Sequence, residues 1–191
     1  MKRLFIAFKI PLDNNFIAAC QSLQQSCTKL DKINWIQPEN LHITLKFLGD
    51  TNDDLIPSIE NNIEKLTSHI TPFEITLNHI GAFGSRYHPR IIWIGSNDVI
   101  PEINVLHKSL EKSMSAFGFK PTFGNFVFHA TLARIHKIDD KKYFWNEIEK
   151  KTSLFSFTFK VNELILFESI LTRTFTPLYK KQKTFYLKSG K

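Results

Sequence analysis

Two short segments of this chain carry the same pattern. Residues 41–49 read LHITLKFLG and residues 128–134 read FHATLAR, so that in each segment a histidine stands two residues before a threonine. Successive side chains of a β-strand point to opposite faces. As strands, both segments would place the histidine and the threonine on one face and the apolar residues on the other. The pattern therefore predicts two strands that each bury one face and present a His–Thr pair on the opposite face.

The sequence around these segments alternates between helix and strand patterns. Apolar residues at steps of three and four predict helices from Asp13 to Leu30, from Ile56 to Ile70 and from Ile103 to Phe117. Further predicted elements are a short helix at residues 139–150, a loop at 81–90, and strands at 3–10, 73–80, 91–95, 154–161, 163–167 and 185–188. Because each half contains a helix, a His-bearing strand and further strands, we expect an α+β fold with two pseudo-equivalent lobes in one domain, residues 1–191.

The overall charge of the chain favours an anionic partner. The 191 residues carry a formal net charge of +7. Such an excess of lysine and arginine is typical of proteins that bind nucleic acids and other anions. A solvated basic surface is the simpler interpretation of many of these lysines, so charge alone does not identify a substrate.

The sequence also bears on localisation and redox state. The apolar run Leu4–Phe8 is too short for a signal peptide, and no segment approaches the ~20 apolar residues of a membrane span. Cys20 and Cys27 lie two turns apart in a predicted helix, which separates them by about 10 Å, too far for a disulfide. We therefore expect a cytoplasmic protein with buried, reduced cysteines, and a monomer because no long amphipathic seam is visible.

Two histidines on matched strand faces can perform acid–base chemistry on a phosphate. An unperturbed imidazole has a pKa near 6.5, so His42 and His129 can each exist in either form at neutral pH. The hydroxyls of Thr44 and Thr131 can donate hydrogen bonds to phosphate oxygens. One His-x-Thr segment alone would be an ordinary half-buried strand, but the duplication favours function. The sequence has no metal-ligand spacing such as H-E-x-x-H and no Gly-rich nucleotide loop, so we expect neither a metal ion nor an organic cofactor.

Several segments resemble the 2H phosphoesterase superfamily, and within it the RNA 2′,3′-cyclic phosphodiesterase family, also described as 2′–5′ RNA ligase-like. The similar segments are RLFIAFKIP, ENLHITLKFLGD, GAFGSRYHPRIIWIG, FHATLARI and ELILFESIL, which extend over nearly the whole chain. The spacing of the two motifs, 129 − 42 = 87 residues, also fits. The resemblance implies two pseudo-symmetric lobes of antiparallel sheet, with helices on the outer faces and a central cleft that carries the two H-x-T motifs.

The same resemblance assigns roles to individual residues. It implies that His42 and His129 form the acid–base pair and that Thr44 and Thr131 hold the phosphate oxygens. It also implies that Arg134 is an electrostatic partner of the phosphate. The partner would be an RNA with a 2′,3′-cyclic phosphate end or a cyclic nucleotide, with no membrane and no obligate protein partner.

Three of the nearby positions depend on details of the strands. Strict alternation places Arg134 on the face opposite His129, so a bulge or a strand end is needed to bring Arg134 to the phosphate. Lys46 shares the face of His42, where contact with solvent is favoured over contact with the phosphate. Phe83 can stack on a base and is included among the substrate-binding candidates, although core packing is favoured as the role of any one of the 18 phenylalanines.

The chain departs from the family pattern at two positions. Phe128 stands where the family usually has a proline, which would stiffen the entry into the strand. Ala130 stands where a larger apolar residue is usual. Elsewhere in the sequence, His107 is predicted to lie on or near the exposed face of its helix.

The duplicated His-x-Thr pattern and the family resemblance together imply metal-independent hydrolysis of RNA 2′,3′-cyclic phosphate ends to 2′-phosphates, and the resemblance makes His129 the base and His42 the acid. One alternative is a related reaction, either 2′–5′ RNA ligation or hydrolysis of another cyclic phosphate such as ADP-ribose 1″,2″-cyclic phosphate. The other alternative belongs to a different class, a non-catalytic RNA- or nucleotide-binding module.

Overall fold

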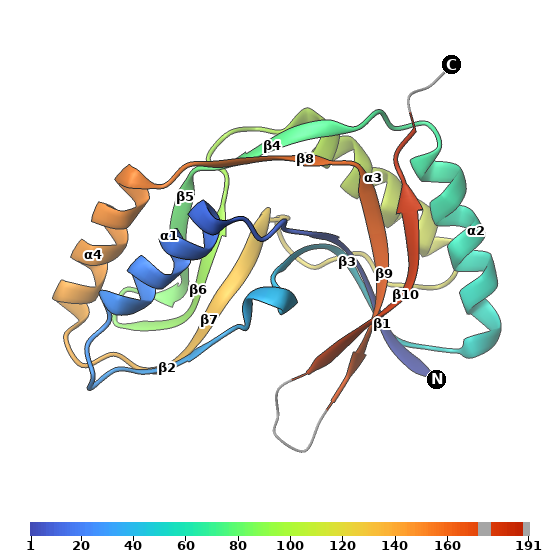
Figure 1. Ribbon diagram of the computed structural model, residues 1–191. Coiled ribbons are helices and arrows are strands. Elements are labelled where there is room, and N and C mark those ends of the chain that lie inside the picture. The colour runs from blue at the N-terminus through green and yellow to red at the C-terminus, as the bar shows by residue number, and fades with distance from the viewer. Residues whose placement is uncertain (172–176, 189–191) are drawn as a thin grey trace.

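The computed structural model describes residues 1–171 and 177–188 (Figure 1). The strands are β1 (Lys2–Lys9), β2 (Lys32–Trp35), β3 (His42–Thr51), β4 (Phe73–Leu77), β5 (His79–Ser85), β6 (His88–Gly95), β7 (His129–Lys137), β8 (Phe157–Val161), β9 (Glu163–Ile170) and β10 (Leu178–Tyr186). The helices are α1 (Asn14–Gln25), α2 (Ile56–Thr67), α3 (Pro101–Ser115) and α4 (Lys141–Leu154). Short 3-10 helices at Pro38–Asn40 and Asp53–Leu55 precede β3 and α2.

The two His-x-Thr segments lie side by side at the centre of one antiparallel sheet. The strand order is β10-β9-β1-β3-β7-β6-β5. The strand β2 lies off this path and pairs with β7 beyond the short contact between β3 and β7. The strands β3 and β7 meet where Ile43 pairs with Ala130. These are the residues between the histidine and the threonine of each motif, so this contact brings both His–Thr pairs to the junction of the two halves.

Each half of the sheet is covered by two helices, as Figure 1 shows. The strands β5, β6 and β7 lie with α1 and α4, whereas β1, β3, β9 and β10 lie with α2 and α3. The short β4–β8 pair runs between the two lobes at the top of this view. The predicted α+β fold with two lobes of antiparallel sheet and outer helices is therefore confirmed.

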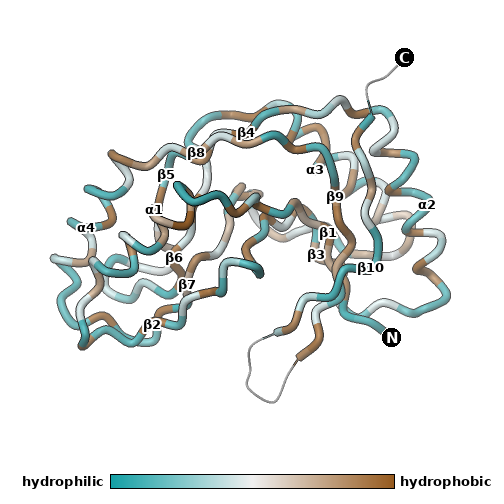
Figure 2. Tube along the Cα trace, viewed as in Figure 1, coloured by the Kyte–Doolittle hydropathy of each residue, from teal (hydrophilic) through white to brown (hydrophobic). Residues whose placement is uncertain are grey.

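The helix faces that the sequence predicts are the buried ones. In α3 the side chains of Ile103, Leu106, Leu110 and Met114 are buried at steps of three and four. In Figure 2 hydrophobic positions gather along the strands, while much of the outer surface of α2 is hydrophilic. None of the helices in residues 1–171 and 177–188 is long and apolar enough to cross a membrane.

The strand β1 is buried on both faces, which gives the lobe two apolar clusters. Leu4, Ile6 and Phe8 belong to the main core under the helices. Phe5 and Ala7 point to the opposite, concave face and pack with Ile165, Phe167 and the half-buried Tyr179. This second cluster forms the floor beside one of the His–Thr pairs.

The predicted loop at residues 81–90 is wrong. Those residues belong to the β5–β6 hairpin, in which Arg86 and Tyr87 make the turn. The glycines concealed the strand pattern, because Gly81 and Gly84 contribute no side chain to an apolar face. Gly84 has a φ of +110°, and a Cβ atom there would collide with the carbonyl oxygen of His88. Glycine is therefore required to form this hairpin.

Other predicted boundaries also changed. The predicted strand at 73–80 divides into β4 and β5 at Asn78, and β2 was not predicted at all. Although 185–188 was the predicted final strand, β10 begins at Leu178, because its lysine-rich first half has no apolar alternation. The exposed lysines of this edge strand discourage its pairing with another chain.

The first helix ends earlier than its apolar pattern suggests. Asp13 caps α1 by accepting a hydrogen bond from the Phe16 amide at 2.7 Å, but the helix stops at Gln25. Cys27 consequently lies outside it. Both cysteines are free and partly exposed rather than fully buried, and burial raises the pKa of each thiol to about 11. The thiolate form is therefore scarce at neutral pH.

Candidate active site

A cavity of about 390 Å³ opens on the concave face where the two halves of the sheet meet. Both His-x-Thr motifs line it, so the structure brings together four of the predicted site residues, His42, Thr44, His129 and Thr131. Arg134 is the fifth predicted residue in the lining. The remaining wall consists of Arg3, Phe5, Ile36, Asn40, Phe47, Ser169, Leu171, Pro177 and Tyr179.

The two histidines are held in the same way. His42 Nδ1 lies 2.7 Å from the carbonyl oxygen of Asn40, and His129 Nδ1 lies 2.7 Å from that of Val127. A carbonyl oxygen can only accept, so each Nδ1 carries the proton and donates it. In the neutral ring Nε2 is then unprotonated. Each imidazole therefore keeps one nitrogen that can take up or release a proton.

Aromatic side chains fix both rings from the side. The His42 ring has Phe5 and Tyr179 at centroid distances of 4.9 Å each. The His129 ring meets Phe83 edge-on at 4.8 Å. Phe83 lies outside the residues that line the cavity, and its ring buttresses His129. Its stacking on a base stays a prediction.

Burial also changes the acidity of both imidazoles. Removal from water lowers the pKa of His42, against a smaller opposite effect of its hydrogen bond to Asn40, and the nearby His129 lowers it further. Burial likewise lowers the pKa of His129, opposed by its hydrogen bond to Val127. Both rings are therefore biased towards the neutral form until an anion occupies the cavity.

A β-bulge follows each His–Thr pair. Ile6 and Ala7 of β1 are consecutive, yet they pair with Lys46 and Thr44, so Leu45 is the extra residue of the bulge. In β7 the extra residue is Leu132, because its neighbours Thr131 and Ala133 pair with consecutive residues of β6. Each bulge therefore leaves two buried residues in succession, Leu45 and Lys46 in β3 and Leu132 and Ala133 in β7.

The bulges decide which side chain joins the His–Thr face. After the extra residue the alternation changes phase, so that Phe47 and Arg134 line the cavity. The bulge at Leu132 is thus the irregularity that Arg134 needs in order to reach the face of His129. The prediction for Lys46 is wrong, since its side chain is 1% exposed and points away from the cavity. A period of two residues cannot reveal an inserted residue.

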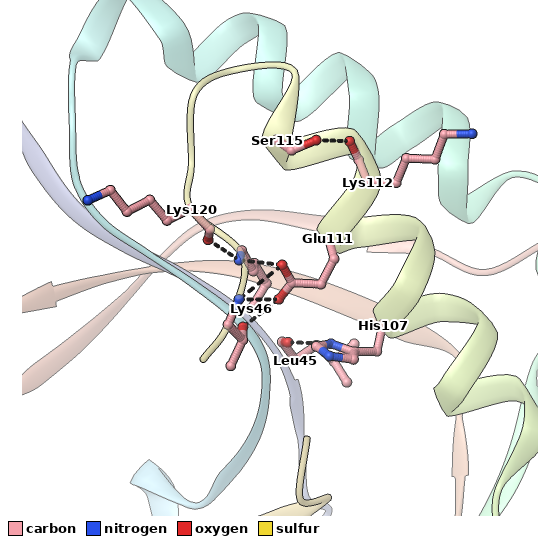
Figure 3. Close-up of polar contacts among 8 residues, drawn as sticks. Leu45, Lys46, His107, Glu111, Lys112, Ser115 and Lys120 are labelled. Carbon is pink, nitrogen blue, oxygen red and sulfur yellow. Dashed lines mark hydrogen bonds and ion pairs between the residues drawn. The ribbon is translucent and has the colours of Figure 1, made fainter. Parts of the chain in front are cut away.

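The side chain of Lys46 and the carbonyl group of Leu45 attach the β3 bulge to α3 (Figure 3). Lys46 Nζ donates to Glu111 Oε2 and to the carbonyl oxygen of Lys120, both at 2.7 Å. His107 Nδ1 donates to the carbonyl oxygen of Leu45 at 3.1 Å. The exposed position predicted for His107 is therefore wrong. Helix α3 follows β6 in one lobe but anchors the bulge in the other, and this linkage connects the two halves.

The same contacts hold the segment that leads to His129. Glu111 accepts hydrogen bonds from the amide and the hydroxyl of Thr122. The His107 ring stacks on Phe126 at a centroid distance of 3.9 Å. Residues 120–126 are thus tied to α3 shortly before the strand begins, in a chain that has Phe128 where a stiffening proline was expected.

Comparisons with known proteins agree with this two-fold construction. The family described as LigT like Phosphoesterase matches the chain twice, over residues 10–93 and 94–176, with one motif in each part. The chain belongs to the LigT like phosphoesterase family. The first matched part contributes His42 and Thr44 to the cavity, and the second contributes His129 and Thr131.

Curated relatives and solved structures cover nearly all of the chain. The RNA 2′,3′-cyclic phosphodiesterase of Methanocaldococcus jannaschii is 34% identical over 89% of this chain and 92% of its own length. The enzyme of the same name from Archaeoglobus fulgidus is 29% identical over 96% and 99%. The fold matches TT0787 of Thermus thermophilus, with a TM-score of 0.80, 21% identity, and 99% and 100% coverage. It also matches E. coli LigT complexed with 3′-AMP, with a TM-score of 0.74, 19% identity, and 97% and 98% coverage.

The cavity of this LigT like phosphoesterase is suited to an anion. Arg3 and Arg134 join the two histidines in its wall, and no Asp or Glu lines it among the described residues. Burial raises the pKa of Tyr179, opposed by the charge of Arg134, so its hydroxyl keeps its proton at neutral pH. Within residues 1–171 and 177–188, no three side chains of His, Cys, Asp or Glu gather as metal ligands would.

The sequence did not single out several of these wall residues. Arg3 and Phe47 face each other across β1 and β3, with the guanidinium 5.0 Å from the ring centre. Tyr179 lies on β10 beside His42. Their positions depend on pairing between strands far apart in the sequence. For Arg3 the available signal was indirect, a lone arginine at the start of a strand pattern, and for Tyr179 there was none, because its segment shows no strand pattern.

Proposed function

We propose that this protein hydrolyses RNA 2′,3′-cyclic phosphate ends to 2′-phosphates without a metal ion. One observation carries the proposal. Two imidazoles, each with Nδ1 held by a carbonyl and Nε2 left for proton transfer, share one cavity with two threonine hydroxyls and an arginine. The LigT like relatives named RNA 2′,3′-cyclic phosphodiesterase support it.

The reaction needs two proton transfers at opposite sides of one phosphorus atom. A water molecule attacks phosphorus in line with the 3′-oxygen, and His129 removes its proton. The new P–O bond forms as the P–O3′ bond breaks, and His42 delivers a proton to the departing 3′-oxygen. The ring phosphate becomes a 2′-phosphomonoester beside a free 3′-hydroxyl. Each positioned transfer is typically worth ~10²–10⁴-fold in rate.

The pKa shifts of His42 and His129 suit a base in the empty site and an acid once the anionic substrate is bound. Burial lowers the pKa of both imidazoles in the empty site, which favours the neutral form that His129 needs as a base. The negative charge of the bound cyclic phosphate raises the pKa of a neighbouring imidazole, which favours the protonated form of His42 that the leaving oxygen needs. In the reverse direction, ligation, the two roles exchange.

The remaining site residues stabilise the charge that develops on phosphorus. Thr44 and Thr131 each stand two residues after a histidine on the same strand face, so their hydroxyls reach non-bridging oxygens from two sides. Arg134 supplies a permanent positive charge, and its planar guanidinium can bind two phosphate oxygens together. Because the site draws on both lobes, we also propose that residues 1–191 act as one domain.

Phosphorus NMR tests the reaction. The protein, with EDTA present, is incubated with 2′,3′-cyclic nucleotides and with a short RNA that ends in a cyclic phosphate. Conversion to the 2′-phosphate is expected, whereas formation of the 3′-phosphate or of a new 2′–5′ linkage would assign a different reaction. Nucleotide binding without turnover would support the non-catalytic module.

Single variants test the assignment of the pair. His42→Ala and His129→Ala should each lower kcat by at least ~10²-fold. His69→Ala is the matched control, since His69 is exposed and lies outside α2 and the cavity. If either site variant kept the rate of the control, that histidine would not be part of the acid–base pair.

A further inference from the structure

A second depression lies directly beside the catalytic cavity. It has a volume of about 810 Å³ and runs over the β5–β6 turn, the outer ends of β6 and β7, and the first residue of α4. Arg134 lines both this depression and the catalytic cavity, so the two adjoin at that residue. We name it the basic groove after its charged residues Arg90, Arg134, Lys137 and Lys141.

The charge of the basic groove has one sign. Its four cations are accompanied by His88 and His136, and no Asp or Glu lines it in the described part of the chain. Within that part, Arg90, Arg134 and Lys141 form no ion pair. Lys137 has one partner, Asp139 at 3.4 Å, in a pair whose side chains are 57% and 42% exposed. Such an exposed pair contributes little and is readily exchanged for another anion.

Strand pairing concentrates the charge further. Lys32 of β2 lies directly opposite Lys137 of β7, and both side chains are exposed. Like charges at opposite positions of an antiparallel pair point to the same face and destabilise the sheet. A polyanion lying along this face would relieve the repulsion. The arrangement is therefore suited to a bound phosphate chain, which would add to the partial neutralisation that Asp139 gives Lys137.

We propose that the basic groove binds the phosphodiester backbone of the RNA on the 5′ side of the cyclic phosphate. The inference rests on the proposed function. A 3′-terminal cyclic phosphate in a cavity of about 390 Å³ leaves the rest of the strand to emerge on its 5′ side. The larger, adjoining, positively charged depression at Arg134 provides a path for it. Tyr87, 77% exposed at the hairpin turn, adds an aromatic face on which a base can stack.

The consequence is a preference for RNA over cyclic mononucleotides that depends on salt. A single strand releases counterions with a slope of about −0.7 per neutralised phosphate in log K against log[salt]. Three cations of the groove lie outside the catalytic cavity, so their contribution to the slope is about 2. Between about 50 and 200 mM salt this amounts to about twentyfold in kcat/KM for an RNA, and to none for a mononucleotide.

The test compares two variants with the same change in net charge. Arg90→Gln/Lys137→Gln/Lys141→Gln removes the groove cations but leaves Arg134 in place. The control, Lys65→Gln/Lys108→Gln/Lys112→Gln, removes three exposed lysines from α2 and α3 in the other lobe. For both, kcat/KM is measured with a cyclic mononucleotide and with a short single-stranded RNA ending in a 2′,3′-cyclic phosphate, over a range of salt concentrations.

The groove variant should lose most of the preference for RNA and about 2 in salt slope, while its activity on the mononucleotide stays that of wild type. The control should retain the preference. Equal RNA kinetics in the two variants would overturn the inference. So would a loss on the mononucleotide as large as the loss on RNA, since that result places the effect in the catalytic cavity.

A binding measurement separates this inference from the proposed function. If the wild-type protein hydrolyses neither substrate, the proposed function has failed, and the groove is then tested by fluorescence anisotropy with a labelled RNA that ends in a 2′-phosphate. Weaker binding by the groove variant than by the control would still support an RNA path. Equal affinities would refute it.

Discussion

The buried ion pair between β3 and α3 offers a sharp test of how the site is held. Lys46 is 1% exposed and Glu111 is 18% exposed, with Nζ and Oε2 2.7 Å apart. Replacement of Glu111 by leucine leaves the Lys46 ammonium buried, with the carbonyl oxygen of Lys120 as its remaining partner. Loss of one member of a buried pair costs about 3–5 kcal/mol. For a chain of this length that corresponds to a fall in Tm of roughly 6–20 °C.

The converse variant should be milder. Lys46→Met leaves Glu111, which is partly exposed and still accepts hydrogen bonds from the Thr122 amide and hydroxyl. The expected loss is about 1–3 kcal/mol. The double variant Lys46→Met/Glu111→Leu leaves no unpaired charge, so it should be more stable than Glu111→Leu alone. The coupling free energy between the two positions should reach ~0.5–3 kcal/mol.

Thermal and urea unfolding followed by circular dichroism measure these differences. Lys108→Met, at an exposed position of α3, is the control and should stay within about 0.5 kcal/mol of wild type. If Glu111→Leu unfolded within about 1 kcal/mol of wild type, the pair would not hold the bulge. Simple additivity of the two single variants would refute the coupling in the same way.

The pH dependence of stability gives an independent check on Glu111. Burial alone would raise the pKa of this carboxyl, but hydrogen bonds from Lys46 and Thr122 and the charge of Lys46 hold the pKa below its usual range. A carboxyl with a lowered pKa in the folded state stabilises the protein above its unfolded pKa of ~4.3. Wild type should lose this stability as the pH falls below that value, and Glu111→Leu should lack that part of the decline.

Three further predictions concern the site. Because burial lowers the pKa of both His42 and His129, kcat/KM for a cyclic mononucleotide should peak below about pH 6.5, and a maximum above neutrality would contradict the assignment. Arg134→Gln should lower kcat/KM by roughly 10–150-fold, from a charged hydrogen bond worth about 1.5–3 kcal/mol, with Tm unchanged because the side chain is exposed. A Cβ atom at Gly81 would lie 2.5 Å from Trp93 Cζ2, so Gly81→Ala should cost about 1–3 kcal/mol and lower kcat more than it changes KM. Steady-state kinetics and thermal unfolding check the last two.

The sequence predicted the His–Thr faces correctly because alternation needs to hold over three residues. It failed at the fifth. Lys46 was assigned to the cavity face, and its true place depends on the extra residue Leu45 and on Glu111, which lies 65 residues further along the chain. A buried lysine is stable only with such a partner. No local pattern could supply it.

The helices were predicted better than the strands for a similar reason. Each helix buries one face that repeats within its own residues, so the pattern of α3 can be recognised locally. The hairpin at residues 79–95 depends instead on cross-strand contacts, among them the close approach of Gly81 to Trp93. Glycines that permit such contacts are more typical of loops in a single sequence.

The paired bulges also show how a nearly symmetric site can treat its two histidines differently. Phe47 and Arg134 occupy equivalent positions, each the third residue after the threonine of its motif, and both line the cavity. At this position one lobe thus offers an aromatic ring, against which the Arg3 guanidinium lies, and the other lobe offers a guanidinium directly. The charge of Arg134 reaches Tyr179, which packs against His42 in the opposite lobe. Two equivalent imidazoles alone would give a bound cyclic phosphate no preferred direction, whereas the different positions of Arg134 and Arg3 distinguish the two sides of the cavity. We therefore expect the residues that follow the two bulges, rather than the histidines themselves, to set the orientation of the substrate and with it the choice of base and acid.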